Sequence, residues 1–251
     1  MKKNLHIPFF IITIICIFSI LLFNNNASID ANNNTGSIIN NPDIYFNKWS
    51  NKSWVTLGDS ITRANGYQSI IKPILGFSNI DNQGINGQTM AYQNKNKSTY
   101  TMGKNIDYNK YDLVTIFSGT NDFRYNKKLG SIKPLGSKNF DKNTFTGSYQ
   151  LLIEYILSSN PNIDLVLITP IQRNRDGYNV NFRNKVDSKL IDYVNTIREL
   201  GNMYSVPVLD LYSESGITEK TMDTFTRDGL HPNDVGYKRI SEKIYRFLLN
   251  I

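Results

Sequence analysis

The sequence of 251 residues has a single cysteine, Cys16, and only two histidines, His6 and His231. Cys16 and His6 lie in the N-terminal segment, so the rest of the chain can form no disulfide and use no cysteine nucleophile. His231 is then the one imidazole base left to the remainder. The sequence also lacks internal repeats, zinc-finger spacings and basic motifs flanked by aromatic residues. Despite a net charge of +7, we therefore expect no nucleic-acid partner.

The N-terminal segment, residues 1–26, has the pattern of an export signal. Lys2 and Lys3 precede an uncharged apolar run from Ile7 to Phe23. The run is long for a cleaved signal and short for a membrane span, so both a signal peptide and an N-terminal membrane anchor remain open. The two lysines favour a cytoplasmic N-terminus. We expect an exported protein that is either secreted or anchored to the outer face of the cytoplasmic membrane.

Beyond this segment, the composition predicts one linker and one domain. Residues 27–46 are rich in asparagine with few apolar residues, which is typical of a linker. Residues 47–251 are long enough to bury one good-sized core. The sequence leaves the oligomeric state open.

Strand-like and helical patterns alternate along this domain. The predicted strands are Trp54–Leu57, Phe77–Asn82, Leu113–Phe117, Leu165–Thr169 and Pro207–Leu211. Predicted helices span Thr146–Leu157 and Lys185–Leu200, and a third, with Ile240, Ile244, Phe247 and Leu248 as its apolar stripe, closes the chain. The alternation predicts an α/β fold: a mostly parallel five-stranded sheet with helices on both faces.

Polar clusters follow four of these segments. They are Gly58-Asp59-Ser60, the stretch 82–87, Gly119-Thr120-Asn121-Asp122 and, after the last strand and a further short segment, the stretch 228–232. Because ligands bind beyond the carboxyl ends of parallel strands, we expect these clusters to meet at one edge of the sheet and to form a site.

The clusters contain the parts of a serine hydrolase. Ser60 is a candidate nucleophile, and His231 is the base that could accept its proton. Asp228, three residues earlier, can orient the imidazole, and Pro232 restricts the backbone of the histidine. The alternative is that the serine is an ordinary turn residue and the histidine a hydrogen-bonded loop residue.

An oxyanion formed at Ser60 would need hydrogen-bond donors. Gly87 lets a backbone N–H approach a substrate closely, and the Asn121 amide can be aimed from a strand end. Together with the Ser60 N–H they would make three donors. Asp59 and Asp122 are interpreted as structural carboxylates that tie down loop N–H groups, and nothing in their spacing predicts a metal pair.

In this order, the four blocks resemble those of the SGNH hydrolases, also called the GDSL esterase/lipase family. They are GDSIT with Ser60, NxGxxGxT with Gly87 and Thr89, GTND with Asn121, and DGLHP with Asp228 and His231. The resemblance covers Ser53 to the C-terminus, although Asn86 stands where many relatives carry serine. The G-x-S-x-G elbow of α/β-hydrolases is absent, since Thr62 is the second residue after the serine.

The resemblance implies a three-layer flavodoxin-like fold and ester hydrolysis without metal or other cofactor. It also implies that Ser60 is the nucleophile, His231 the base and Asp228 its orienting acid. The implied oxyanion donors are the Ser60 N–H, Gly87 and Asn121.

The sequence predicts the substrate less specifically than the reaction. We expect an ester of a small acyl group on carbohydrate or cell-envelope material, with lipid or aryl esters as the other options. The basic loop Arg124–Lys142 is either a solvated face or a rim that attracts an anionic polymer or surface. Three further residues in the loop after the fourth strand are candidates for the same rim: Arg173, Arg175 and Tyr178.

Two alternatives to an esterase stay open. An O-acyltransferase could use the same three residues with a sugar hydroxyl in place of water. A non-catalytic module that binds carbohydrate or the cell envelope could have the same fold.

Overall fold

The computed structural model describes residues 47–94 and 98–251. The predicted export segment, residues 1–26, and the predicted linker, residues 27–46, lie outside the described residues. In the part that is described, no helix is both long and apolar enough to cross a membrane.

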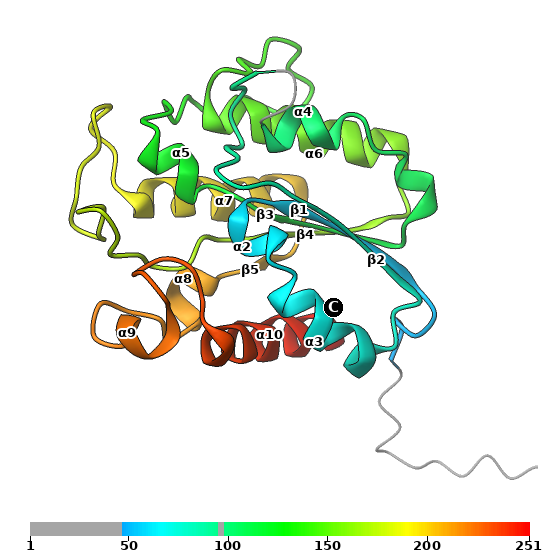
Figure 1. Ribbon diagram of the computed structural model, residues 1–251. Helices are drawn as coiled ribbons and strands as arrows, with labels where there is room; N and C mark the ends of the chain where they lie inside the picture. Colours follow the sequence, from blue (N-terminus) through cyan, green and yellow to red (C-terminus); the bar gives the residue numbers. More distant parts are fainter. Residues whose placement is uncertain (1–46, 95–97) are drawn as a thin grey trace, which may run out of the picture. The chain divides into compact units, whose positions relative to one another are not determined.

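A five-stranded parallel sheet forms the centre of the fold (Figure 1). Its strands are β1 (Ser53–Gly58), β2 (Asn79–Gly84), β3 (Leu113–Phe117), β4 (Asp164–Ile168) and β5 (Val208–Leu209). They lie in the order β2-β1-β3-β4-β5, and every neighbouring pair is parallel. This is the flavodoxin-like order, so the predicted fold class is confirmed.

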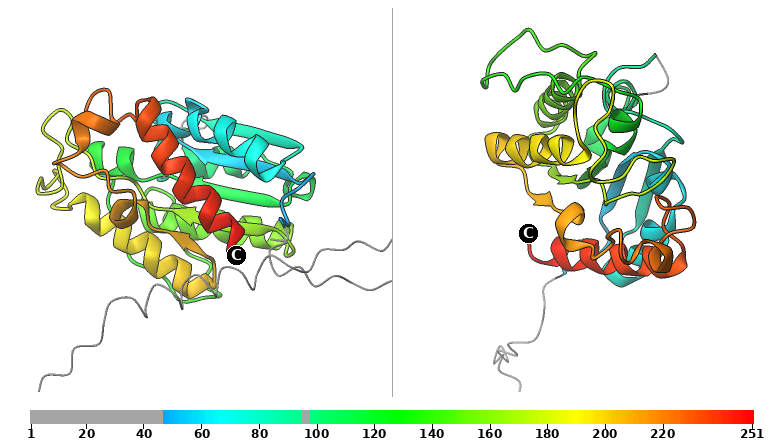
Figure 2. Two further views of the ribbon diagram at one scale, coloured as in Figure 1. Left: turned by 90° about the horizontal axis from the view of Figure 1, so that it is seen from below. Right: turned by 90° about the vertical axis from the view of Figure 1, so that its left-hand side faces the viewer.

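Helices cover both faces of this sheet (Figures 1 and 2). One face carries α3 (Gly66–Leu75), α8 (Leu211–Glu214) and α10 (Asp234–Leu249), with α3 and α10 side by side. The other face carries α4 (Thr99–Gly103), α6 (Phe145–Ser159) and α7 (Leu190–Tyr204). Short helices follow β1 and β3 or lie in loops: α2 (Ser60–Arg63), α5 (Thr120–Arg124), α9 (Met222–Phe225) and the 3₁₀ turn Tyr108–Lys110.

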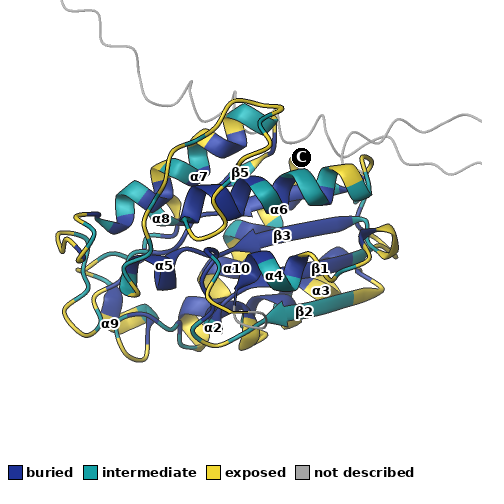
Figure 3. Cartoon of the chain, turned by 90° about the horizontal axis from the view of Figure 1, so that it is seen from above, coloured by how far each residue is buried: buried dark blue, intermediate teal, exposed yellow. Residues whose placement is uncertain are grey.

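Two apolar cores result, one on each face. The residues of β1 and β3 contribute to both, because alternate side chains of a strand point to opposite faces. Trp54 packs in the core that includes α10, and Val55 packs in the core that includes α6. Every residue of β3 is buried, whereas β2 is only half-buried at the edge of the sheet (Figure 3). The sheet thus holds its central strands rigidly, and these strands lead into the polar clusters.

The bounds of several elements differ from the sequence prediction. β2 begins at Asn79 rather than Phe77 and runs to Gly84, and β5 is two residues long. α7 begins at Leu190 rather than Lys185, because the Asn184 side chain accepts the backbone N–H groups of residues 186 and 188 and holds them in a turn. α3, which contains Pro73, was not predicted.

Candidate active site

The strand order changes direction between the neighbouring strands β1 and β3. The chain leaves β1 toward β2 on one side of this pair, and it leaves β3 toward β4 on the other side. Loops diverge at such a point and leave a crevice beyond the carboxyl ends of the strands. Ser60 follows β1 and Asn121 follows β3, so both lie at this crevice. The topology therefore brings the first and third polar clusters together.

Ser60 is the first residue of α2. The chain turns sharply at Gly58, the last residue of β1, and only Asp59 separates the strand from the helix. Gly58 permits this turn, because a Cβ there would lie 2.2 Å from the Thr62 hydroxyl and 2.6 Å from the carbonyl oxygen of Phe117. Asp59 then caps the helix, and its carboxylate accepts the Ile61 N–H at 2.9 Å. The Gly-Asp-Ser sequence thus fixes the backbone from which the serine hydroxyl projects.

Asp228 and His231 belong to a closed turn between α9 and α10. The Arg227 N–H donates to the carbonyl oxygen of His231 at 2.8 Å, and the bridge between Thr226 and Pro232 closes the base of the turn. One carboxylate oxygen of Asp228 accepts the backbone N–H of His231 at 2.8 Å. The turn therefore holds the aspartate and the histidine in one fixed arrangement.

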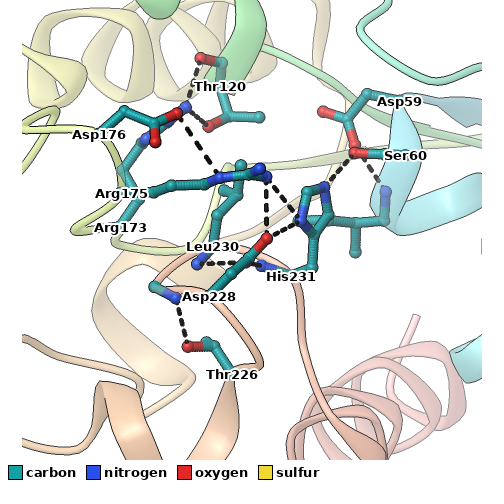
Figure 4. Close-up of polar contacts among 12 residues, drawn as sticks. Asp59, Ser60, Thr120, Arg173, Arg175, Asp176, Thr226, Asp228, Leu230 and His231 are labelled. Carbon is teal, nitrogen blue, oxygen red and sulfur yellow. Dashed lines mark hydrogen bonds and ion pairs between the residues drawn. The ribbon is translucent and has the colours of Figure 1, made fainter.

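Three side chains form a continuous chain of hydrogen bonds (Figure 4). The Ser60 hydroxyl lies 2.9 Å from Nε2 of His231, and Nδ1 of the same ring lies 2.8 Å from Oδ2 of Asp228. A carboxylate accepts only, so Nδ1 carries the proton and Nε2 is the acceptor for the serine hydroxyl. This is the tautomer that a general base for Ser60 requires.

A fourth side chain, Arg175, contacts the same carboxylate. Its Nη1 lies 2.9 Å from Oδ2 of Asp228 and 3.0 Å from Nδ1 of His231. Because Nδ1 and Nη1 are both donors, they share the carboxylate oxygen and do not bond to each other. Burial raises the pKa of Asp228, but the hydrogen bonds from His231 and the charge of Arg175 outweigh this and lower it below the usual range. Asp228 is thus ionised at neutral pH.

The predicted oxyanion donors lie around the same cavity. Ser60, Gly87, Asn121 and His231 all line it. Within the described residues, no acceptor pairs with the backbone N–H of Ser60 or of Gly87. Asn121 donates one of its two amide N–H bonds to the carbonyl oxygen of Gln88 at 3.0 Å, which fixes the amide and leaves its second N–H.

The structural interpretation of Asp59 and Asp122 agrees with their contacts. Asp59 caps α2, while Asp122 accepts the N–H groups of Met90 and Ala91 at 2.8 and 2.9 Å. Burial raises the pKa of Asp59 to about 6 and that of Asp122 to about 7, even though these hydrogen bonds oppose the shift. Asp122 thereby ties the loop that carries Gly87 to the end of β3.

The cavity has a volume of about 450 Å³. Asn86, the residue that departs from the family pattern, is part of its wall. Three lining residues lie outside the predicted clusters and the basic loop: Ala64, Arg227 and Tyr237. Tyr237 comes from α10, and its hydroxyl donates to the carbonyl oxygen of Ile61. A residue so far along the chain gives no local signal that it reaches Ser60.

The predicted rim needs two corrections. Arg124 and Arg175 do line the cavity. Arg173 does not: it is 1% exposed, and its Nη1 donates to the carbonyl and hydroxyl oxygens of Thr120. Tyr178 also lies off the cavity, because its ring packs edge-on against Phe123.

The basic loop contributes only its first two residues, Arg124 and Tyr125, to the part of the cavity that the described residues form. Arg124 is a lining residue, and the lysines of the loop are not. Lys127 donates to the carbonyl oxygen of Tyr92, and Lys142 lies over the ring of the same tyrosine. Across residues 47–94 and 98–251, no three His, Cys, Asp or Glu side chains are grouped so as to hold a metal ion.

Comparisons with known proteins agree with this fold. A model of the GDSL-like Lipase/Acylhydrolase family matches residues 56–239, a segment that contains every cavity residue named above. Among solved structures, a protein from Lactobacillus plantarum is 27% identical, with 79% of this chain and 97% of that chain covered and a TM-score of 0.70.

Two further structures are similar to the chain. A possible lipase from Chitinophaga pinensis is 25% identical over 78% of this chain and 96% of its own, with a TM-score of 0.63. The lipase/acylhydrolase from Enterococcus faecalis is 24% identical over 79% and 96%, with a TM-score of 0.57, and shares the fold. No curated protein matches the chain.

Proposed function

Because the chain belongs to the GDSL-like lipase/acylhydrolase family, whose members are ester hydrolases, we propose that it cleaves carboxylic esters with Ser60, His231 and Asp228. The observation that carries the proposal is the relay of two short contacts, 2.9 Å from the serine hydroxyl to Nε2 and 2.8 Å from Nδ1 to the carboxylate. A serine hydroxyl is a weak nucleophile unless a neighbouring base accepts its proton.

The reaction follows from these positions. Ser60 attacks the ester carbonyl carbon while Nε2 of His231 takes the hydroxyl proton. The imidazolium is stabilised by Asp228 and then passes its proton to the leaving alcohol oxygen. Water, activated by the same nitrogen, cleaves the acyl-enzyme and releases the acid.

The negative charge that develops on the carbonyl oxygen needs donors that are already in place. Three donors are available at the cavity: the backbone N–H groups of Ser60 and Gly87, which have no acceptor in the part of the chain that is described, and the second amide N–H of Asn121. Each such donor is worth roughly 3 to 4 kcal/mol of transition-state stabilisation.

The proposal extends to location and substrate. The Lys-Lys and apolar pattern of residues 1–26 supports export, and an exported enzyme meets acylated carbohydrate and other envelope material. The cavity of about 450 Å³ lies toward the lower end of the range for ligand-binding clefts, and we propose small acyl groups as its first substrates. Hydrolysis profiles from acetyl to long-chain esters would test this, with a fall in kcat/KM as the acyl chain lengthens as the expected result.

The direct test of the activity is turnover of p-nitrophenyl acetate. Ser60→Ala is expected to lower kcat by on the order of 10⁵-fold, because the nucleophile is lost. Ser69→Ala is the matched control, since that hydroxyl is exposed on α3 and bonds only to the carbonyl oxygen of Gly66. Equal turnover in the two variants would contradict the proposal. Product analysis with an added polyol separates hydrolysis from transfer, and acyl transfer as the main outcome would make the protein an acyltransferase.

A further inference from the structure

The charged residues that line the cavity are of one kind. Apart from His231, they are three arginines, Arg124, Arg175 and Arg227, and no aspartate, glutamate or lysine is among the lining residues. We propose that the cavity selects esters whose alcohol part carries an anionic group, such as a carboxylate, and that Arg227 is its main contact. This inference rests on the proposed esterase function and specifies its substrate class.

The three arginines differ in how closely each is already paired with a carboxylate. Arg175 is held at 2.9 Å by the carboxylate of Asp228, so its charge already has a partner inside the relay. Arg124 pairs with Asp176 at 3.3 Å, and both side chains are partly exposed. Among the described residues, Arg227 pairs only with Asp234, at the 4.0 Å limit of an ion pair, and the two side chains are 63% and 97% exposed. An exposed pair at that distance contributes almost nothing, so Arg227 is the guanidinium most available to a ligand.

A buried cation adds to the positive potential behind the cavity. Arg173 donates to Thr120, the residue before Asn121, but its Nε and Nη2 have no acceptor among the described residues. No carboxylate in the described part of the chain lies within ion-pair distance of Arg173. Burial and the charges of Arg124 and Arg175 lower the pKa of Arg173 only to about 10, so it remains charged at neutral pH. The carboxylates of Asp176 and Asp59 offset part of this charge, but a buried positive charge is poorly screened and contributes to the attraction of an anion into the crevice.

The chemistry of the relay indicates which part of the ester carries the anion. His231 has to protonate the leaving oxygen, so the alcohol part lies on the histidine side of Ser60. Arg227 is in the same turn as the histidine, and its backbone N–H donates to the carbonyl oxygen of His231. Arg124, by contrast, is one helical turn from Asn121 and lies on the oxyanion side. An anion on the alcohol part thus meets Arg227, while Arg124 takes a secondary position.

The test compares an anionic ester with its neutral counterpart. The pair is para-acetoxybenzoate and its methyl ester, which release nearly the same phenol and differ by one charge on the alcohol part. The ratio of their kcat/KM values is expected to fall about threefold to tenfold in Arg227→Gln, the effect of losing a partly exposed charge contact. The same ratio is expected to fall as salt is added to the unmodified protein.

Arg246→Gln is the matched control, because it removes the same charge from an exposed position on α10, where Arg246 pairs with Glu242. In Arg246→Gln, the ratio of kcat/KM for the anionic ester to that for the neutral ester is expected to stay unchanged. A ratio that is the same in Arg227→Gln as in the unmodified protein would overturn the inference. So would a charge preference found only on the acyl side, measured with p-nitrophenyl hydrogen succinate against p-nitrophenyl butyrate. Loss of neutral-ester turnover in Ser60→Ala tests the esterase function separately, whichever ratio is found.

Discussion

Asp228 binds His231 twice, with one carboxylate oxygen 2.8 Å from the backbone nitrogen and the other 2.8 Å from Nδ1 of the ring. The same carboxylate therefore fixes the position of the histidine backbone and the orientation of its imidazole. As a result, Nε2 points at the Ser60 hydroxyl. The spacing of three residues between aspartate and histidine is what permits both contacts within one turn.

Asp228→Asn is expected to abolish this control of the tautomer. The amide would present an NH₂ group or a weaker acceptor to Nδ1, so the ring nitrogen facing the serine would no longer be a reliable acceptor. We expect kcat for p-nitrophenyl acetate to fall about 10³- to 10⁴-fold, with a native circular dichroism spectrum. Asp223→Asn, which removes a carboxylate from the exposed start of α9, serves as the control. If the two variants had similar kcat values, Asp228 would have no role in the reaction.

The contrast between Asp228 and Arg173 illustrates what the sequence can predict about this site. Asp228 and His231 are three residues apart and share a turn, so their contact follows from local geometry. Arg173 was placed on the rim because it follows a strand end, but it folds inward onto Thr120, and only long-range packing determines this. Arg227 directly precedes Asp228 and could have been noticed from that position alone.

The elements of the fold also divide into those that the local sequence pattern predicts and those that it does not. The apolar pattern gives β3 with the right bounds, because a fully buried central strand is a continuous apolar run. β2, at the edge of the sheet, has the sequence NIDNQG, and its bounds shifted because polar residues are tolerated there. α3 was missed because Pro73 interrupts its helical pattern, although buried Tyr67 and Ile71 anchor it in the core.

Asn121→Ala is expected to lower kcat roughly a hundredfold or more, because the proposed amide donor to the oxyanion is lost. The variant also loses the bond to the carbonyl oxygen of Gln88, so Tm should fall slightly as well. Asn160→Ala is the matched control: it removes an amide bond to the carbonyl oxygen of Tyr108 at the other end of the sheet. The control should lose stability and keep its kcat. An unchanged kcat in Asn121→Ala would mean that the amide does not bind the oxyanion.

Gly87→Ala tests the backbone of the oxyanion loop. Gly87 has a φ angle of +71°, and an added Cβ would meet only the Tyr125 hydroxyl, at 3.4 Å, so the cost is one of backbone strain, about 1 to 2 kcal/mol. Gly136→Ala imposes the same strain at φ +82° in open space, away from the cavity. Urea unfolding should show similar losses for both, whereas only Gly87→Ala should lower kcat, about tenfold to a hundredfold. A full kcat in Gly87→Ala would contradict the prediction that backbone strain at this position disturbs the oxyanion loop.

Asp122 makes the stability of the fold depend on pH. Its pKa is raised to about 7 in the folded state, so the folded protein binds this proton more tightly than the unfolded chain does. The stabilisation is complete below the unfolded pKa and is lost as the pH rises through about 7. The free energy of unfolding of the unmodified protein, minus that of Asp122→Asn, should therefore be larger at pH 5 than at pH 8, by roughly 2 kcal/mol. A difference that is independent of pH, measured by urea unfolding, would contradict this.

Covalent trapping of the nucleophile tests the central claim most directly. A serine-reactive organophosphonate should add one adduct to the native protein, and peptide mapping should place it on Ser60. His231→Ala should slow the labelling strongly, since the base 2.9 Å from the hydroxyl is removed. Labelling of a different residue, or ester turnover that persists while Ser60 stays unmodified, would contradict the account.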